Sequence, residues 1–100
     1  MSLPSSSGSS AAVRLRPARK LPQRRLGGDT VMVDPRARKV FLLNPVAGVV
    51  WAGVERGASE EEIVADVVAR FRVETPQAAA DVRRFVGELE AAGLAAPVQS

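Results

Sequence analysis

The sequence contains no cysteine and no histidine among its 100 residues. Without cysteine it can form neither a disulfide nor a thiolate metal site. Without histidine it lacks the commonest general base at neutral pH and the commonest metal-ligating side chain. These two absences argue against catalysis and favour a binding function.

Long apolar runs are absent too. No stretch approaches the roughly 18 apolar residues that a membrane span requires, and the N-terminus lacks the hydrophobic region of a secretory signal. We therefore expect a soluble, cytoplasmic protein with no membrane partner.

The N-terminus has few residues that could join a core. Residues 1–12 are almost all Ser, Gly, Pro and Ala, and such a segment buries too little surface to offset the entropy of ordering it. We predict a disordered Ser- and Arg-rich tail over residues 1–19, one folded domain over residues 20–96, and a short C-terminal tail over residues 97–100. A domain of this size can hold one modest core but no deep catalytic cavity.

Charge is distributed unevenly along the chain. Residues 1–50 carry nine Lys or Arg and two Asp, a net charge of +7, whereas residues 51–100 carry five Arg and nine acids, a net charge of −4, which together give +3. The basic half could attract phosphate or an acidic peptide. Arg side chains that only solvate an exposed tail and turn explain the pattern equally well.

The strongest structural signal lies in Val31–Trp51 and the residues just before it. Thr30–Asp34 and Lys39–Leu43 have the composition of strands and are joined by a Pro/Arg turn. A weaker, polar strand is predicted over Leu21–Leu26, before the Gly27-Gly28 turn. Because Lys39–Leu43 is apolar on both faces, it is either central in a sheet or an edge strand that lacks cover.

Three helices are predicted after these strands. The pairs Asn44-Pro45 and Thr75-Pro76 each place a capping residue before a proline, and Ser59 opens a capping box. Gly57 and Gly93 suit the left-handed conformation that ends the first and third helices. The predicted fold is therefore α+β and winged helix-turn-helix-like, with a two- to three-stranded antiparallel sheet followed by three α-helices.

Candidate catalytic features have simpler structural explanations. Glu60-Glu61-Glu62 could be a carboxylate cluster for acid–base chemistry or Mg²⁺, but a solvated first helical turn explains it better. Ser59 would need a nearby base to act as a nucleophile, and the chain has no histidine. Gly27-Gly28 lacks the spacing and the lysine of a phosphate loop. We predict no enzyme, no catalytic residue, no cofactor and no metal site.

The run Gly28-Asp29-Thr30-Val31-Met32-Val33-Asp34-Pro35, followed by Val40-Phe41-Leu42-Leu43-Asn44-Pro45, resembles the PqqD-like family. These small domains, also called RiPP recognition elements, hold the leader segments of precursor peptides for modifying enzymes. The resemblance covers about residues 20–96, and the chain departs from it in its long N-terminus and in Arg56-Gly57, where many members carry an acidic residue before the glycine. Further matching positions are Ala47 to Trp51, Gly57, Ile63, the Phe71 segment, Ala80-Asp81-Val82, Leu89 and Gly93-Leu94.

The resemblance implies a mode of binding. The leader peptide would add as an antiparallel strand to the edge of Lys39–Leu43 and lie against the last helix, Pro76 to Ala92. Strand addition obtains affinity from main-chain hydrogen bonds and specificity from side-chain pockets. The candidate peptide-binding residues are Lys39, Val40, Phe41, Leu42, Leu43, Asp81, Arg84, Phe85 and Glu88.

Several of these candidates have an alternative explanation. A core position explains Phe41 and Leu43 better than ligand contact, and Trp51 also falls on an apolar helix face. Asp81 is equally well explained as an exposed acid near the start of its helix. Periodicity does not decide whether the groove is faced by the flank of the last helix that contains Asp81 or by the opposite flank, which contains Arg83 and Glu90.

The favoured hypothesis is a stand-alone binding protein that captures the leader of a ribosomally made precursor peptide and presents it to modifying enzymes. By the resemblance, the partner would be a radical SAM enzyme, or a leader protease and cyclase. One alternative is a winged-helix nucleic-acid-binding protein, but Glu60, Glu61, Glu62 and Asp66 on the second helix would repel phosphates. A structural subunit of an enzyme complex is a second alternative.

Overall fold

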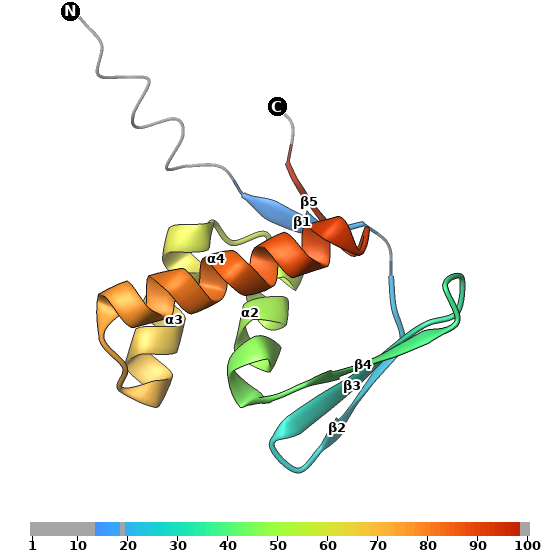
Figure 1. Cartoon of the computed structure of the whole chain (residues 1–100), viewed down its shortest axis with the longest axis horizontal. Coiled ribbons are helices and arrows are strands. Elements are labelled where there is room, and N and C mark those ends of the chain that lie inside the picture. The colour runs from blue at the N-terminus through green and yellow to red at the C-terminus, as the bar shows by residue number, and fades with distance from the viewer. Residues whose placement is uncertain (1–13, 19, 99–100) are drawn as a thin grey trace, which may run out of the picture.

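The computed structural model describes residues 14–18 and 20–98 and has an α+β fold (Figure 1). A three-stranded antiparallel sheet in the order β2-β3-β4 is followed by three helices, as predicted. The strands are β2 (Gln23–Leu26), β3 (Asp29–Asp34) and β4 (Lys39–Leu43). Gly27, with φ of +63°, allows the tight turn between β2 and β3.

The register of β3 and β4 decides which side chains are buried. Thr30 lies opposite Leu43, and Asp34 lies opposite Lys39. Met32 is fully buried, whereas Val33 faces outward. The same alternation on β4 buries Leu43 and leaves Val40 and Leu42 each 68% exposed. Of the two expectations for β4, the exposed edge strand is therefore correct.

Three helices form the rest of the main core: α2 (Pro45–Glu55), α3 (Glu60–Phe71) and α4 (Thr75–Ala91). The Asn44 side chain accepts a hydrogen bond of 2.8 Å from the Ala47 N–H and so caps α2. The capping box of α3 is confirmed. The predicted cap of α4 is wrong, because Thr75 already lies inside the helix and the N-cap Glu74 makes no side-chain bond there.

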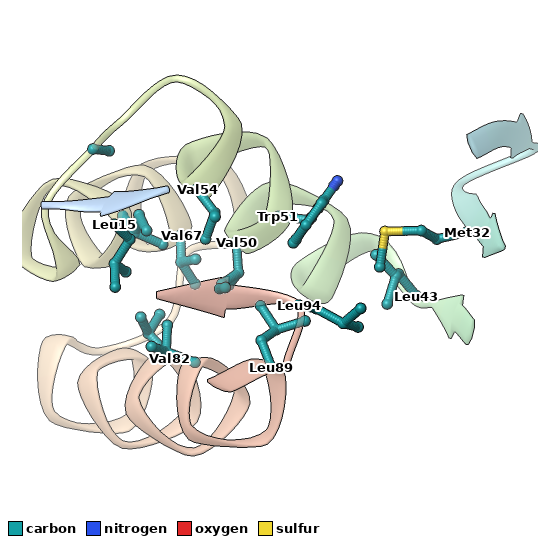
Figure 2. Packing of buried hydrophobic residues seen from close by; sticks show 14 of the residues in the cluster. Leu15, Met32, Leu43, Val50, Trp51, Val54, Val67, Val82, Leu89 and Leu94 are labelled. Atoms are coloured by element: carbon teal, nitrogen blue, oxygen red, sulfur yellow. The ribbon is translucent and has the colours of Figure 1, made fainter. Parts of the chain in front are cut away.

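The helices pack around aliphatic side chains and one tryptophan (Figure 2). Gly53 marks the close approach of α2 to α3, because a Cβ added there would lie 2.5 Å from Ile63 Cγ1. The largest fully buried apolar side chains of the core are Trp51, Met32, Ile63, Leu94, Val50, Val54, Val67 and Val82.

A two-stranded sheet joins the two ends of the described chain. β1 (Leu15–Pro17) pairs antiparallel with β5 (Ala95–Pro97), and the two lie side by side in Figure 1. The Leu15 N–H also donates to the Ala58 carbonyl at 3.1 Å, and its side chain is buried in the core. Residues 14–18 and Pro97 therefore belong to the folded domain, and the predicted domain limits at residues 20 and 96 are too narrow. Most of the predicted tail, residues 1–13 and 19, lies outside the described residues.

Candidate peptide-binding groove

Strand β4 offers a free edge beside the helices. Within the described part of the chain, β4 pairs only with β3, so the N–H and C=O groups of its other edge have no strand partner. Such an edge is a template for pairing with another extended chain. Because two of its exposed side chains, Val40 and Leu42, are also apolar, the edge suits a peptide ligand.

A groove of about 390 Å³ lies between β4, the start of α2 and α4. Leu42 contributes from β4, and α2 contributes mainly aliphatic side chains. The flank of α4 that faces the groove is the one that contains Asp81. The complete lining is Asp29, Leu42, Asn44, Val46, Ala47, Val50, Asp81, Arg84, Phe85 and Glu88.

The structure therefore brings five of the nine candidate residues together: Leu42, Asp81, Arg84, Phe85 and Glu88. The other four lie on β4 outside the groove lining. Leu43 is buried, and Phe41 is half-buried and packs against the core. Val40 is exposed on the same face as Leu42, and Lys39 is exposed near the hairpin turn.

Carboxylates outnumber cations in the groove, with Asp29, Asp81 and Glu88 against Arg84. Gln77 Nε2 donates to both oxygens of Asp81 at 3.1 Å, and Arg84 Nη2 lies 3.5 Å from Asp81 Oδ1. Neither the Asp29 carboxylate nor the Glu88 carboxylate has a hydrogen-bond or ion-pair partner among the described residues. The groove thus combines an apolar wall with acids that are free to bind a cationic group.

Sequence reasoning missed the contribution of α2 to this groove. In the sequence, Val46 and Val50 recur at helical spacing, a pattern that predicts core rather than groove. Val50 is indeed buried, but both residues also reach the groove wall. A local pattern carries no signal for this double role, because it depends on where α4 packs.

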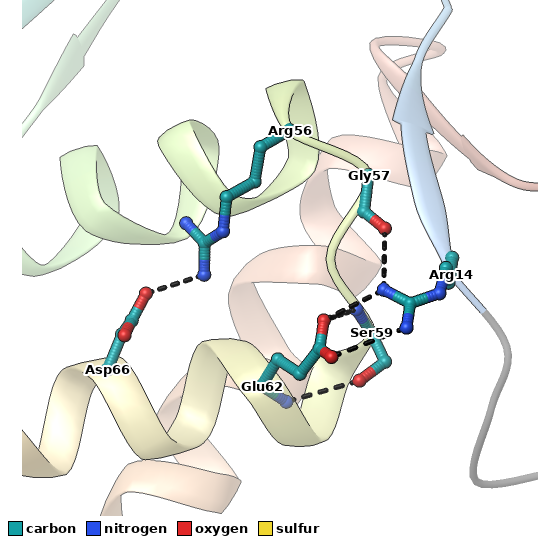
Figure 3. Close-up of polar contacts among 6 residues, drawn as sticks. All are labelled: Arg14, Arg56, Gly57, Ser59, Glu62 and Asp66. Carbon is teal, nitrogen blue, oxygen red and sulfur yellow. Dashed lines mark hydrogen bonds and ion pairs between the residues drawn. The ribbon is translucent and has the colours of Figure 1, made fainter.

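The acidic turn at the start of α3 is used within the fold (Figure 3). Glu62 Oε1 accepts from the Ser59 N–H at 3.1 Å and from Arg14 Nη1 at 2.9 Å. The Ser59 N–H bond, followed by the Arg14 hydrogen bond, lowers the pKa of the Glu62 carboxyl. Glu60 lies 3.6 Å from Arg83 Nε. These contacts explain Glu62 as a capping and ion-pair group and Glu60 as an ion-pair group.

Two further features bear on the kind of site. Among residues 14–18 and 20–98, no group of three or more Asp, Glu, His or Cys side chains is placed to hold a metal ion. The helices in the same residues are all too short or too polar to cross a membrane.

Two solved structures resemble this chain closely in fold. The structure of TbiB1 in complex with the TbiA(beta) leader peptide has a TM-score of 0.73 and 22% identity, over 85% of this chain and 99% of that one. The structure of lasso peptide synthetase B1 complexed with the leader peptide has a TM-score of 0.72 and 22% identity, over 83% and 98%. No curated protein matches significantly.

The family model described as coenzyme PQQ synthesis protein D (PqqD) matches residues 29–95. This match extends from the start of β3 to the start of β5, so it includes β4 and all three helices. It confirms the resemblance that the sequence motifs indicated. The chain belongs to the PqqD family.

Proposed function

We propose that this protein captures the leader segment of a ribosomally made precursor peptide and presents it to a modifying enzyme, without catalysing a reaction itself. The observation that carries the proposal is the free apolar edge of β4 beside the groove between α2 and α4. The two similar solved structures, each a complex with a leader peptide, support it. Precursor peptides are made in the cytoplasm, where the protein would act.

The leader would add to β4 as an antiparallel strand. Four or so main-chain hydrogen bonds at about 0.5–1.5 kcal/mol each supply roughly 2–6 kcal/mol. Ordering a disordered leader costs about 2–5 kcal/mol. The backbone terms nearly cancel, so side chains must decide which peptide is bound. Leu42 and Phe85 offer apolar contact, and Asp81 and Glu88 offer charge.

The acid excess in the groove favours a leader with a basic residue next to its apolar anchor. We expect Glu88→Gln to weaken leader binding by about 2- to 5-fold, an effect that fades at high salt because this acid is exposed. Glu90→Gln is the matched control, since Glu90 is exposed on α4 but does not line the groove. Equal effects of the two variants, measured by calorimetry at two salt concentrations, would show that only overall charge matters.

The direct test is an NMR titration of the ¹⁵N-labelled chain with the leader of a co-encoded precursor peptide. We expect chemical-shift changes confined to residues 39–43, the start of α2 and the Asp81 flank of α4. Absence of binding at high micromolar peptide would refute the proposal. Binding that shifts only β1 and β5 would refute the groove as the site.

The modifying enzyme that receives the peptide would be a radical SAM enzyme or a leader protease and cyclase. A duplex-DNA gel shift separates this function from nucleic-acid binding. Salt-sensitive DNA binding that the leader peptide does not affect would favour the winged-helix alternative.

A further inference from the structure

A second cavity, of about 520 Å³, lies between the sheet and the helices α2 and α3. Its walls include Arg25 from β2, Trp51 from α2 and Arg70 from α3. No residue lines both this cavity and the leader groove, although α2 contributes to each. Two ligands can therefore be held on the two flanks of α2 at the same time.

The acids in the cavity wall already have partners. Glu55 Oε2 accepts from Gln23 Nε2 at 2.7 Å, and Asp66 Oδ2 lies 2.6 Å from Arg56 Nη2 (Figure 3). The two remaining cations do not. Neither Arg25 nor Arg70 makes an ion pair or side-chain hydrogen bond with any described residue. The cavity thus has two guanidinium groups available for an anion.

Trp51 adds a third donor. Its side chain is 2% exposed, and its buried Nε1 has no acceptor among the residues that the structure describes. Figure 2 shows this nitrogen directed away from Val50 and Leu94. Trp51 lines the cavity, and buried donors are normally paired, so an acceptor that reached the indole N–H would gain a partner there.

We propose that this cavity docks a carboxylate-bearing loop of the modifying enzyme that receives the leader peptide. Carboxylates accept charge-assisted, bidentate hydrogen bonds from guanidinium groups. The identity of this partner rests on the proposed function. A leader that suits the acid-rich groove is repelled by the arginines of the cavity. Residues 1–13 contain no Asp or Glu, so they cannot supply the carboxylate.

Trp51 is the only tryptophan of the chain, so it provides a single-residue probe. The full chain is labelled with 5-fluorotryptophan, saturated with leader peptide and titrated with the co-encoded enzyme. We expect the single ¹⁹F signal to move or broaden on enzyme addition. Arg25→Gln and Arg70→Gln should each weaken enzyme binding by about tenfold or more, with leader affinity unchanged.

Arg24→Gln is the matched control, because Arg24 precedes Arg25 on β2, is also exposed and does not line the cavity. Equal losses in the Arg24→Gln and Arg25→Gln variants would overturn the proposal in favour of non-specific charge attraction. A ¹⁹F response to millimolar acetate but not to the enzyme would overturn it in favour of a small-anion site.

Leader affinity measured without enzyme separates the two proposals. If the Arg25→Gln and Arg70→Gln variants bind both the leader and the enzyme as tightly as the unmodified chain does, only the docking site is overturned. If the unmodified chain does not bind the leader, the proposed function is overturned. If the ¹⁹F signal moves as the concentration of the chain rises without enzyme, a second copy of the chain is the occupant. That result would also overturn the docking proposal.

Discussion

Leu42 and Val40, each 68% exposed, are the most exposed large apolar side chains in the described part of the chain. Both lie on the edge strand β4, and an exposed apolar edge is a hazard for aggregation unless a ligand or partner covers it. Leu42 also lines the groove, whose lining includes Phe85 and Glu88. This one residue therefore links the free strand edge to the side-chain pocket.

We expect Leu42→Ala to weaken leader binding while the fold is preserved. Loss of its buried contact with the peptide costs about 1–2 kcal/mol, or about 5- to 30-fold in Kd. Isothermal titration calorimetry measures the change. Val33→Ala is the control, since Val33 is exposed on the neighbouring strand outside the groove. If the two variants bound equally well, Leu42 would not contact the leader.

Glu62 provides a residue-level prediction about pH. Its pKa is lowered from the ordinary 4.5 by the Ser59 N–H and then by Arg14. For an acid with a lowered folded-state pKa, the stabilisation is fully present above the unfolded value and is lost as pH falls through the folded value. The unmodified chain should therefore lose more stability than Glu62→Gln between neutral pH and pH values below 4.5.

Thermal unfolding at pH 7 and about pH 3 checks this difference. Glu61→Gln removes the same charge from the same helical turn, but the Glu61 carboxylate makes no ion pair or hydrogen bond with the described residues. Its pH response should match that of the unmodified chain. A Glu62→Gln variant that also matches would show that the capping and Arg14 contacts contribute nothing measurable.

At the scale of elements, α2 determines the arrangement of both the groove and the cavity. One flank of this helix lines the groove, and the other lines the cavity beneath the sheet. Its packing against α3 is close at Gly53, which is buried and faces Ile63. A shift of α2 would change the groove and the cavity together, so the absence of a side chain at Gly53 supports the site indirectly.

Two glycine substitutions test this packing. Gly53→Ala should lower the free energy of unfolding by about 1–3 kcal/mol, because the new Cβ would lie 2.5 Å from Ile63 Cγ1. Gly87→Ala on α4 has no atom within 4 Å of its new Cβ and should raise stability by up to about 1 kcal/mol. Urea denaturation measures both. A neutral Gly53→Ala would mean that α2 and α3 separate at little cost.

At the scale of the whole molecule, β1 and β5 join the two ends of the chain over the helices. The Val98 N–H donates to the Arg14 carbonyl at 2.7 Å, and the Ala18 N–H donates to the Leu94 carbonyl at 2.9 Å. Leu15 then anchors β1 in the core. This pairing closes the domain on the side away from the three-stranded sheet (Figure 1), so it acts on global stability rather than on the groove.

We expect Leu15→Ala to destabilise the whole domain by about 2–5 kcal/mol, because it removes a buried side chain. Arg16→Ala on the same strand changes an exposed residue and should have little effect. Chemical denaturation followed by circular dichroism compares the two. If Leu15→Ala lowered the free energy of unfolding no more than Arg16→Ala, β1 would lie outside the unit that unfolds cooperatively.

The features that the sequence determined by itself are local. Asn44-Pro45 and the Ser59 capping box locate two helix starts, because a cap depends on residues only three positions apart. The strands β3 and β4 follow from short runs of β-branched and other apolar residues. The family motifs led to the PqqD family, which the match over residues 29–95 confirms.

Tertiary structure decided what depends on distant contacts. β1 and β5 have only three residues each, and Leu15 pairs with Pro97 at the far end of the chain, so no local periodicity reveals them. The flank of α4 that faces the groove, and the role of Val46 and Val50 in its wall, depend on how α4 packs on α2. Side-chain spacing defines the faces of a helix, but only packing decides which face remains open to a ligand.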